Sequence, residues 1–279
     1  MASTIALLTD FGTQDTYVGV MKAVMLGINP ATQFIDLTHE IRPQNVRQAA
    51  LVLLNTYRYC PAGTVFLTVV DPGVGGMRKP IAVRAGGYSF VAPDNGLLSY
   101  VLDELPEKQI VELTNPDYRL PTISHTFHGR DVFAPAAAHL AAGVPLESLG
   151  TVQANYAKQM LPMTNVTEKA IIGQVLYSDH FGNLITSIGT FEWMDDGQLQ
   201  LTPRFKKNLA PVMIQANQVT ITAGSAILKG IHRTYSTGKL GEALALVDSN
   251  GFLEIAINQG NAANRLNLPM TTQVIIQIG

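Results

Sequence analysis

One stretch, Val65 to Arg78, constrains the fold more than any other part of this sequence. It begins with the apolar run Val65–Val70, rich in β-branched residues, which predicts a buried strand that ends at the carboxylate of Asp71. A proline-glycine turn, the glycine-rich loop Gly73–Gly76 and Arg78 follow. Ligands of α/β proteins bind beyond the carboxyl ends of strands, so this order of strand, acid, loop and base favours an active site. A plain turn with an incidental aspartate is the alternative, because Asp, Pro and Gly are common turn residues.

The glycine loop does not fit a phosphate-binding motif. It contains no G-x-G-x-x-G pattern, and Lys79-Pro80 leads into another apolar run instead of opening a helix. The sequence also has no Walker-type lysine motif. We therefore predict that the loop positions Asp71 and Arg78 rather than binding a pyrophosphate.

The first part of the sequence alternates between strand and helix patterns. Strands are predicted over 5–8 and 33–37, and apolar residues recur at helical spacing over 17–28 and 46–57. Together with the Val65–Val70 strand, this β-α-β-α-β order predicts an α/β domain with a mainly parallel sheet. Further strands are predicted over 81–85, 88–92 and 110–113, and further helices over 97–102 and 131–142.

The pattern changes close to residue 165. Beyond it, short alternating apolar runs separated by Gly, Asn and Asp predict the strands of a smaller, all-β, barrel-like domain. These predicted strands cover 171–177, 184–188, 212–214, 219–221, 243–247, 252–257 and 274–278. We therefore predict two domains, residues 1–164 and residues 165–279.

Composition and charge narrow the class of protein. Of the 279 residues, 47% are hydrophobic and 14% are charged, which indicates a globular chain rather than a disordered one. A formal net charge of −2 predicts no basic surface for nucleic acid. Cys60 is the only cysteine, which excludes an internal disulfide and a cysteine-based metal cluster, and we expect it to be buried. With no signal-peptide pattern and no apolar run long enough for a bilayer, we expect a soluble, cytoplasmic protein.

Three polar residues before and within the predicted helix 131–142 are candidates for a metal site. His125, His128 and Asp131 lie close together in the sequence. The two histidines do not have the spacing of a standard zinc site, so no metal is predicted. A lone histidine beside an aromatic residue is more often structural than catalytic, and this alternative applies to His128.

Acidic and amide residues in loops form a second group of candidates. Asp10 follows the first predicted strand and either caps a turn or binds a sugar diol. The loops 178–183, 248–251 and 258–261 are typical of hairpin turns, although their amides can also contact the edge of an adenine.

The order of these motifs along the chain resembles that of one enzyme family. The motifs are Thr9-Asp10-Phe11-Gly12, Val70 to Gly76 with Arg78, Pro93-Asp94-Asn95-Gly96, Phe127-His128-Gly129-Arg130-Asp131, Asp179 with Phe181-Gly182-Asn183, and Ser249-Asn250-Gly251. The chain resembles the S-adenosyl-L-methionine (SAM) hydroxide adenosyltransferases, which are adenosyl-forming SAM hydrolases related to the SAM-dependent fluorinase and chlorinase. The resemblance covers essentially the whole chain.

The resemblance implies a fold and an assembly. The expected fold is an α/β N-terminal domain followed by a β-barrel-like C-terminal domain. The expected assembly is a homotrimer in which SAM lies between the first domain of one subunit and the second domain of its neighbour. The first domain would then carry the catalytic set, and the second would complete the SAM site.

The resemblance also implies roles for individual residues. The Asp-Arg-His set of the hydrolases maps onto Asp71, Arg78 and His128, and the halogenases lack this set. Substrate binding is expected from Asp10, Phe11, Asp94, Asn95, Asp179, Phe181, Asn183, Tyr235, Ser249, Asn250, Asn258 and Gln259. Within this group Asp10 corresponds to the ribose contact, and Asp179 and Ser249 to the methionine contacts. The chain departs from the fluorinase at Asn250, where that enzyme has arginine, and at Ile185, where it has tryptophan.

The implied reaction is attack of water or hydroxide on the ribose C5′ of SAM, which yields adenosine and L-methionine. SAM is then the substrate, and no cofactor or metal is expected. Two alternatives remain: a SAM-dependent halogenase that uses chloride or fluoride, and a non-catalytic protein that binds SAM or adenosine.

Overall fold

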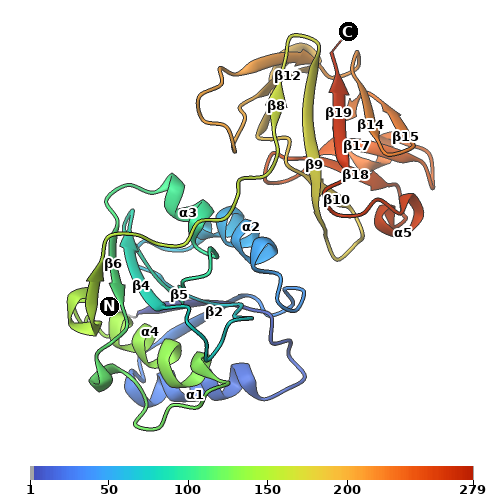
Figure 1. The fold of residues 1–279 in the computed structure, drawn as a ribbon. Helices are drawn as coiled ribbons and strands as arrows, with labels where there is room; N and C mark the ends of the chain where they lie inside the picture. Colours follow the sequence, from blue (N-terminus) through green and yellow to red (C-terminus); the bar gives the residue numbers. More distant parts are fainter. Residues whose placement is uncertain (1–2, 279) are drawn as a thin grey trace. The chain divides into compact units, whose positions relative to one another are not determined.

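The chain folds into two units that each have their own sheets and core (Figure 1). The structure, a computed structural model, describes residues 3–278. The division between the units falls after Met160, four residues before the boundary that the sequence analysis placed after residue 164.

The first unit is built on a seven-stranded sheet with the order β2-β1-β3-β5-β4-β6-β7. Its strands are β1 (Thr4–Thr9), β2 (Gln33–Thr38), β3 (Val65–Val69), β4 (Pro80–Ala85), β5 (Tyr88–Pro93), β6 (Gln109–Glu112) and β7 (Thr151–Gln153). The pairs β1–β2, β1–β3 and β3–β5 are parallel, whereas β4–β5, β4–β6 and β6–β7 are antiparallel.

The predicted α/β class with a mainly parallel sheet is therefore wrong, because the sheet is mixed. The reason lies at Gly86 and Gly87, which both have positive φ and join β4 to β5 as a tight hairpin. A hairpin forces antiparallel pairing, and β6 then adds to the free edge of β4 in the antiparallel sense. Across the described residues strands β1 to β19 far outnumber helices α1 to α5, so the chain is mostly β.

Four helices cover the two faces of the first sheet (Figure 1). They are α1 (Tyr17–Ile28), α2 (Val46–Thr56), α3 (Ser99–Glu104) and α4 (Ala134–Ala141). Side chains alternate across each strand, so β1 places Ile5 and Leu7 in the core under α1 and α4, and Ala6 and Leu8 in the core under α2 and α3. Burial on both faces explains why β1 and β3 appear in the sequence as continuous apolar runs.

The helix predicted over 131–142 begins differently. Residues Gly129–Phe133 form a π-helical turn, and α4 continues from Ala134. Such single π turns inside helices occur frequently at functional sites. The turn carries His128 at its start, directly after Phe127.

The second unit is a β structure around a large apolar core, with a small second cluster beside it. A curled, barrel-like sheet has the order β15-β14-β19-β9-β10-β18-β17-β16 with β8 added to β9, and β11-β12-β13 form a small separate sheet. The strands are β8 (Asn165–Val166), β9 (Ala170–Ser178), β10 (Leu184–Thr186), β11 (Phe191–Trp193), β12 (Gln198–Leu201), β13 (Val212–Gln215), β14 (Thr220–Ala223), β15 (Ala226–Lys229), β16 (Ile231–His232), β17 (Ala243–Val247), β18 (Leu253–Ile257) and β19 (Gln273–Gln277). One short helix, α5 (Ala262–Leu266), follows β18.

The structure also bears on the expectations for Cys60 and for membrane-spanning segments. Cys60 is buried, as predicted, and burial raises the pKa of its thiol. Among the described residues no helix is long and apolar enough to cross a membrane.

Candidate active site

The side chains of Asp71, Arg78 and His128 meet at the carboxyl end of β3. The Nε of Arg78 donates to Oδ1 and Oδ2 of Asp71 at 3.0 and 2.9 Å, and its Nη2 also donates to Oδ2. The same Nη2 donates to Nδ1 of His128 at 2.8 Å. The side chains of Arg78 and Asp71 are only 9% and 5% exposed, so this charged pair is shielded from solvent and rigidly held.

The contact with Arg78 fixes the protonation of His128. A guanidinium carries donors only, so Nδ1 of His128 has to accept, and the proton of the neutral ring lies on Nε2. Burial and then the positive charge of Arg78 lower the pKa of His128, while Asp71 and Asp131 oppose this shift. His128 is therefore neutral at physiological pH and offers Nε2–H as a hydrogen-bond donor.

The glycine loop lets this set assemble. Gly75 has a φ of +74°, and a Cβ at this position would clash with the carbonyl oxygen of His125. The loop between Asp71 and Arg78 thus packs directly on the backbone that precedes His128, and only glycine allows that approach. The loop runs into β4 rather than into a helix, in agreement with the prediction that it positions side chains.

The π-helical turn holds His128 from the other side. The ring of Phe133 lies 5.3 Å from the guanidinium carbon of Arg78. The buried Asp131 accepts from Nε of Arg130 at 2.6 Å and from the backbone N–H of Ser124 at 2.8 Å. Burial alone would raise the pKa of Asp131, but these hydrogen bonds hold it below its usual value, so its carboxylate is committed to fixing the turn.

A cavity of about 160 Å³ opens beside this set. Asp71 and His128 line it together with Phe11, Tyr17 and Phe127, among other residues. The three aromatic rings lie with centroids 5.1 to 5.9 Å apart and form an apolar wall. The set therefore faces a small, partly apolar space, where charge interactions are stronger than in bulk water.

The predicted ribose contact, Asp10, lies at the end of β1 next to Phe11. Its Oδ2 accepts the backbone N–H of Gln44 at 2.7 Å. Gln44 has a φ of +66°, which is uncommon for a residue with a side chain, so the backbone is held in this form by its surroundings.

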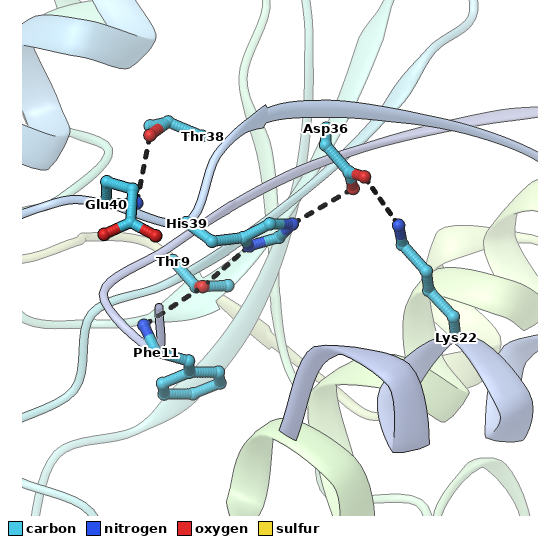
Figure 2. Close-up of polar contacts among 7 residues, drawn as sticks. All are labelled: Thr9, Phe11, Lys22, Asp36, Thr38, His39 and Glu40. Carbon is cyan, nitrogen blue, oxygen red and sulfur yellow. Dashed lines mark hydrogen bonds and ion pairs between the residues drawn. The ribbon is translucent and has the colours of Figure 1, made fainter. Parts of the chain in front are cut away.

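A chain of hydrogen bonds fixes the end of β1 (Figure 2). Lys22 donates to Asp36 at 2.6 Å, Asp36 lies 3.0 Å from Nε2 of His39, and Nδ1 of His39 lies 2.9 Å from Oγ1 of Thr9. Oγ1 of Thr9 in turn accepts the N–H of Phe11 at 3.3 Å. Thr9 and His39 are buried, whereas Lys22 and Asp36 reach the surface, so the network ties the backbone at Phe11, which lines the cavity, to the outside of the unit.

Asp94 and Asn95 are engaged in holding backbone. Nδ2 of Asn95 donates to the carbonyl oxygen of Val70 at 2.9 Å, directly before Asp71. Oδ1 of Asp94 accepts from the N–H of Ala157 at 2.7 Å. Neither lines the 160 Å³ cavity, so the structure gives them a supporting position at the end of β3 and β5.

The second unit gathers most of its predicted site residues around two neighbouring cavities. The larger, of about 580 Å³, includes Gln259 in its lining. The smaller, of about 450 Å³, includes Asp179, Ser249 and Asn250. Phe181, Asn183 and Tyr235 line both, whereas Asn258 lines neither and donates to the carbonyl oxygen of Gly238 at 2.9 Å.

Two of the three loops, 178–183 and 248–251, are hairpin turns, as their residues suggested, whereas 258–261 joins β18 to α5 and is not a hairpin. Residues of all three loops line the cavities. Asp179 accepts from the backbone N–H and from Nδ2 of Asn183 at 2.8 and 3.1 Å. This closes the turn from β9 to β10 and leaves Phe181 74% exposed. Oδ1 of Asp248 accepts from the N–H groups of Asn250 and Phe252, which closes the turn before β18.

One residue that the sequence analysis missed lies in the 450 Å³ cavity. Glu254 is 3% exposed and accepts a hydrogen bond from the hydroxyl of Tyr235 at 2.7 Å. Burial raises its pKa to about 7, the Tyr235 hydrogen bond opposes the rise, and Asp179 and Asp248 add to it. The signal in the sequence is a single acid inside the apolar run 252–257.

The considered metal site finds no support in the geometry. Asp131 is occupied by Arg130 and Ser124, and Nδ1 of His128 by Arg78. Within residues 3–278 there is no group of three or more His, Cys, Asp or Glu side chains arranged to hold a metal ion.

Comparison with known proteins identifies the family. Residues 5–150 match the SAM hydroxide adenosyltransferase N-terminal domain, and residues 173–275 match the corresponding C-terminal domain. The chain therefore belongs to the SAM hydroxide adenosyltransferase family.

Individual relatives match over nearly their whole length. The (R)-S-adenosyl-L-methionine hydrolase of Salinispora arenicola is 37% identical, with 100% of both chains covered. The protein of the same name from Thermus thermophilus is 37% identical over 95% of each chain. A crystal structure of an uncharacterised conserved protein from Thermotoga maritima has a TM-score of 0.84 and 38% identity, and the match covers 98% of this chain and 99% of that one. The fluorinase of Nocardia brasiliensis is more distant, at 27% identity over 99% and 97% of the two chains.

The buried Glu254 predicts a dependence of stability on pH. The unfolded chain loses this proton near the ordinary glutamate pKa of 4.5, whereas the folded protein keeps it up to about 7. Between these values the unfolded state binds fewer protons, so the wild type loses stability as pH rises. We expect Glu254→Gln to lose less stability over this range, measured as thermal midpoints across pH. The exposed Glu242→Gln is the control and should follow the wild type; parallel curves for all three proteins would contradict the assignment.

Proposed function

We propose that this protein hydrolyses SAM to adenosine and L-methionine. The observation that carries the proposal is the buried contact of Arg78 with both Asp71 and His128 beside the cavity at the end of β3. Membership of the SAM hydroxide adenosyltransferase family and full-length similarity to proteins named SAM hydrolases support it.

The proposed reaction is a displacement at the ribose C5′. The oxygen of water forms a bond to C5′ while the bond from C5′ to the sulfonium sulfur breaks. The electron pair of that bond passes to sulfur, which leaves as the neutral thioether of methionine, and one water proton is released. No general acid is needed, because the leaving group is uncharged.

In this proposal, the three polar side chains hold the attacking water. Arg78 keeps Nδ1 of His128 occupied, so Nε2–H of His128 donates to the water oxygen. Asp71 accepts three hydrogen bonds from Arg78 and, with about four lone-pair positions on a carboxylate, retains capacity for a water proton. The water is then oriented between a donor and an acceptor, and its proton leaves toward Asp71.

The low exposure of the site helps this reaction because charge is lost along the path. A water that becomes anionic attacks a sulfonium cation, and both charges disappear in the product. In the 160 Å³ cavity the aromatic wall takes the place of part of the bulk water, and Asp71 and His128 are the fixed polar groups that stabilise such a path.

We further propose that both units contact SAM and that copies of the chain share each site. Asp10 and Phe11 would hold the ribose end, with Asp94 and Asn95 supporting the same strand ends. Asp179 and Ser249 would hold the methionine, and Phe181, Asn183, Tyr235, Asn250 and Gln259 the remaining surface, with Asn258 supporting the loop from its position outside both cavities. A homotrimer, with the first unit of one copy and the second unit of the next on one substrate, is the proposed assembly, and no cofactor is required.

The test of the function is incubation with SAM in isotopically heavy water. We expect adenosine that carries the heavy oxygen on C5′, together with an equal amount of L-methionine. A parallel incubation with chloride or fluoride should give the same product. A 5′-halo-5′-deoxyadenosine would replace the proposal by a halogenase, and tight SAM binding without any product would replace it by a SAM-binding protein.

Because Arg78 holds both Asp71 and His128, we expect its substitution to lower turnover strongly and to change SAM binding little. Arg78→Lys keeps the positive charge near the buried Asp71 but loses the fork that reaches two partners at once. We expect kcat to fall by about 100-fold or more while the Kd for SAM changes little. The control is Arg84→Lys, an exposed arginine on β4, which should behave as the wild type. Equal kcat values for Arg78→Lys and the wild type would remove the assignment.

The shared site predicts that two inactive variants restore activity together. Arg78→Lys damages the first unit and Asp179→Ala the second, so each alone should be nearly inactive. In trimers of randomly mixed copies, about a quarter of the sites would combine an intact first unit with an intact second unit. Co-expression should therefore give about a quarter of the wild-type activity per site. No recovery in a confirmed mixed oligomer would show that each site is formed by one copy.

A further inference from the structure

Glu254 is the acidic member of a row of side chains that crosses the barrel-like sheet. Its cross-strand neighbours are Ile185 on β10 and Leu246 on β17, and Ile185 in turn pairs with Tyr177 on β9. Residues paired directly across strands project from the same face of a sheet. All four line the 450 Å³ cavity, so the row forms one wall of it.

The opposite face of β18 belongs to the core. Leu253, Ile255 and Ile257 pack in the large apolar cluster of the second unit, whereas Ala256 joins a small cluster with Leu244 and Leu246. Glu254 thus occupies a position where an apolar side chain would complete the wall. Burying a carboxylate there is unfavourable without a compensating partner, so its presence points to a ligand.

The carboxylate of Glu254 has an unused acceptor. Tyr235 donates to Oε1, and no other described residue donates to this carboxylate. The second oxygen, Oε2, is not among the fully buried polar atoms that lack a partner. It belongs to a residue that lines the cavity.

The charged groups around Glu254 are mainly acidic. Asp179 follows β9 and Asp248 follows β17, and both raise the pKa of Glu254. Tyr235 is neutral, because burial and then the hydrogen bond to Glu254 raise its pKa. Arg233 lies on the ring of Trp193, with its guanidinium carbon 4.2 Å from the ring centroid, and lines the same cavity. The wall formed by Asp179, Asp248 and Glu254 therefore attracts a cation that can also donate hydrogen bonds.

We propose that Glu254 determines specificity for the amino-acid end of the substrate by accepting a hydrogen bond from its ammonium group, alongside Asp179. The inference rests on the proposed function, because it takes SAM as the ligand of this cavity. An ammonium carries three donors and can reach two carboxylates, whereas a sulfonium has none and a nucleoside has no positive charge. Glu254 thus lets the protein discriminate in binding between SAM and adenosine, the product of the proposed reaction.

The direct test compares two ligands on Glu254→Gln by calorimetry. Glutamine keeps the shape and the contact with Tyr235 but removes the negative charge. We expect the Kd for SAM to rise by about tenfold or more, since hydrogen bonds to charged groups are the strong ones, while the Kd for adenosine stays unchanged. Glu242→Gln, an exposed charge loss outside both cavities, should leave both constants as in the wild type. Equal loss for SAM and adenosine, or no loss for SAM, would overturn the proposal.

A second measurement uses the wild type alone and does not depend on the variant folding. Glu254 is charged only above a pH of about 7, so the Kd for SAM should rise toward the Glu254→Gln value as pH falls below that point. The Kd for adenosine should not change with pH. In Glu254→Gln the rise of the Kd for SAM at low pH should be absent. Above a pH of about 8 the ammonium of SAM loses its own proton, so the informative range lies below that value. A flat SAM curve in the wild type would contradict the role of Glu254.

Failure of this inference and failure of the proposed function give different results. If the wild type releases adenosine but Glu254→Gln binds SAM normally, only the role of Glu254 falls. If the wild type binds SAM with the expected dependence on Glu254 but yields no adenosine, only the hydrolysis falls. If the wild type does not bind SAM, both fall.

Discussion

The interaction on which the site depends is the double contact of Arg78 with Asp71 and His128. One guanidinium satisfies a buried carboxylate and at the same time takes the lone pair of a histidine ring nitrogen. A lysine could not reach both, because it lacks the planar fork. The contact leaves His128 neutral with its proton on Nε2. In the proposed reaction Asp71, and not His128, therefore accepts the water proton. Everything around the contact holds these three side chains, from Gly75 against His125 to Asp131 under the π-helical turn.

The two units contribute different kinds of chemistry. The first supplies rigid polar groups beside an apolar wall, where the network from Lys22 to Phe11 keeps the aromatic side locked. The second supplies carboxylates, and burial raises the pKa of one of them, Glu254, to about 7. The raised pKa costs the folded protein stability at neutral pH, and natural binding sites commonly accept such a cost.

Much of the fold and part of the candidate site could be predicted from the sequence, and the physical reason differs from one element to the next. Helix α1 and strands β1 and β3 follow from local periodicity, and Asp71 with Arg78 follows from seven residues of spacing. The mixed sheet was missed because strand direction depends on the hairpin at Gly86 and Gly87 and on pairing with β6, which periodicity does not encode. His128 is 50 residues from Arg78, so only the family resemblance, and not spacing, joined them. Glu254 was hidden inside an apolar run, because its face is decided by register with β10 and β17.

The protonation of His128 is the most direct test of the claim that Arg78 organises the site. Nitrogen-15 NMR of the wild type at about neutral pH reports both ring nitrogens separately. We predict a neutral ring with the proton on Nε2 and an unprotonated Nδ1, and the loss of this fixed tautomer in Arg78→Lys. A ring that carries its proton on Nδ1, or one that is doubly protonated at that pH, would contradict the donor role of Arg78 and with it the proposed arrangement of the attacking water.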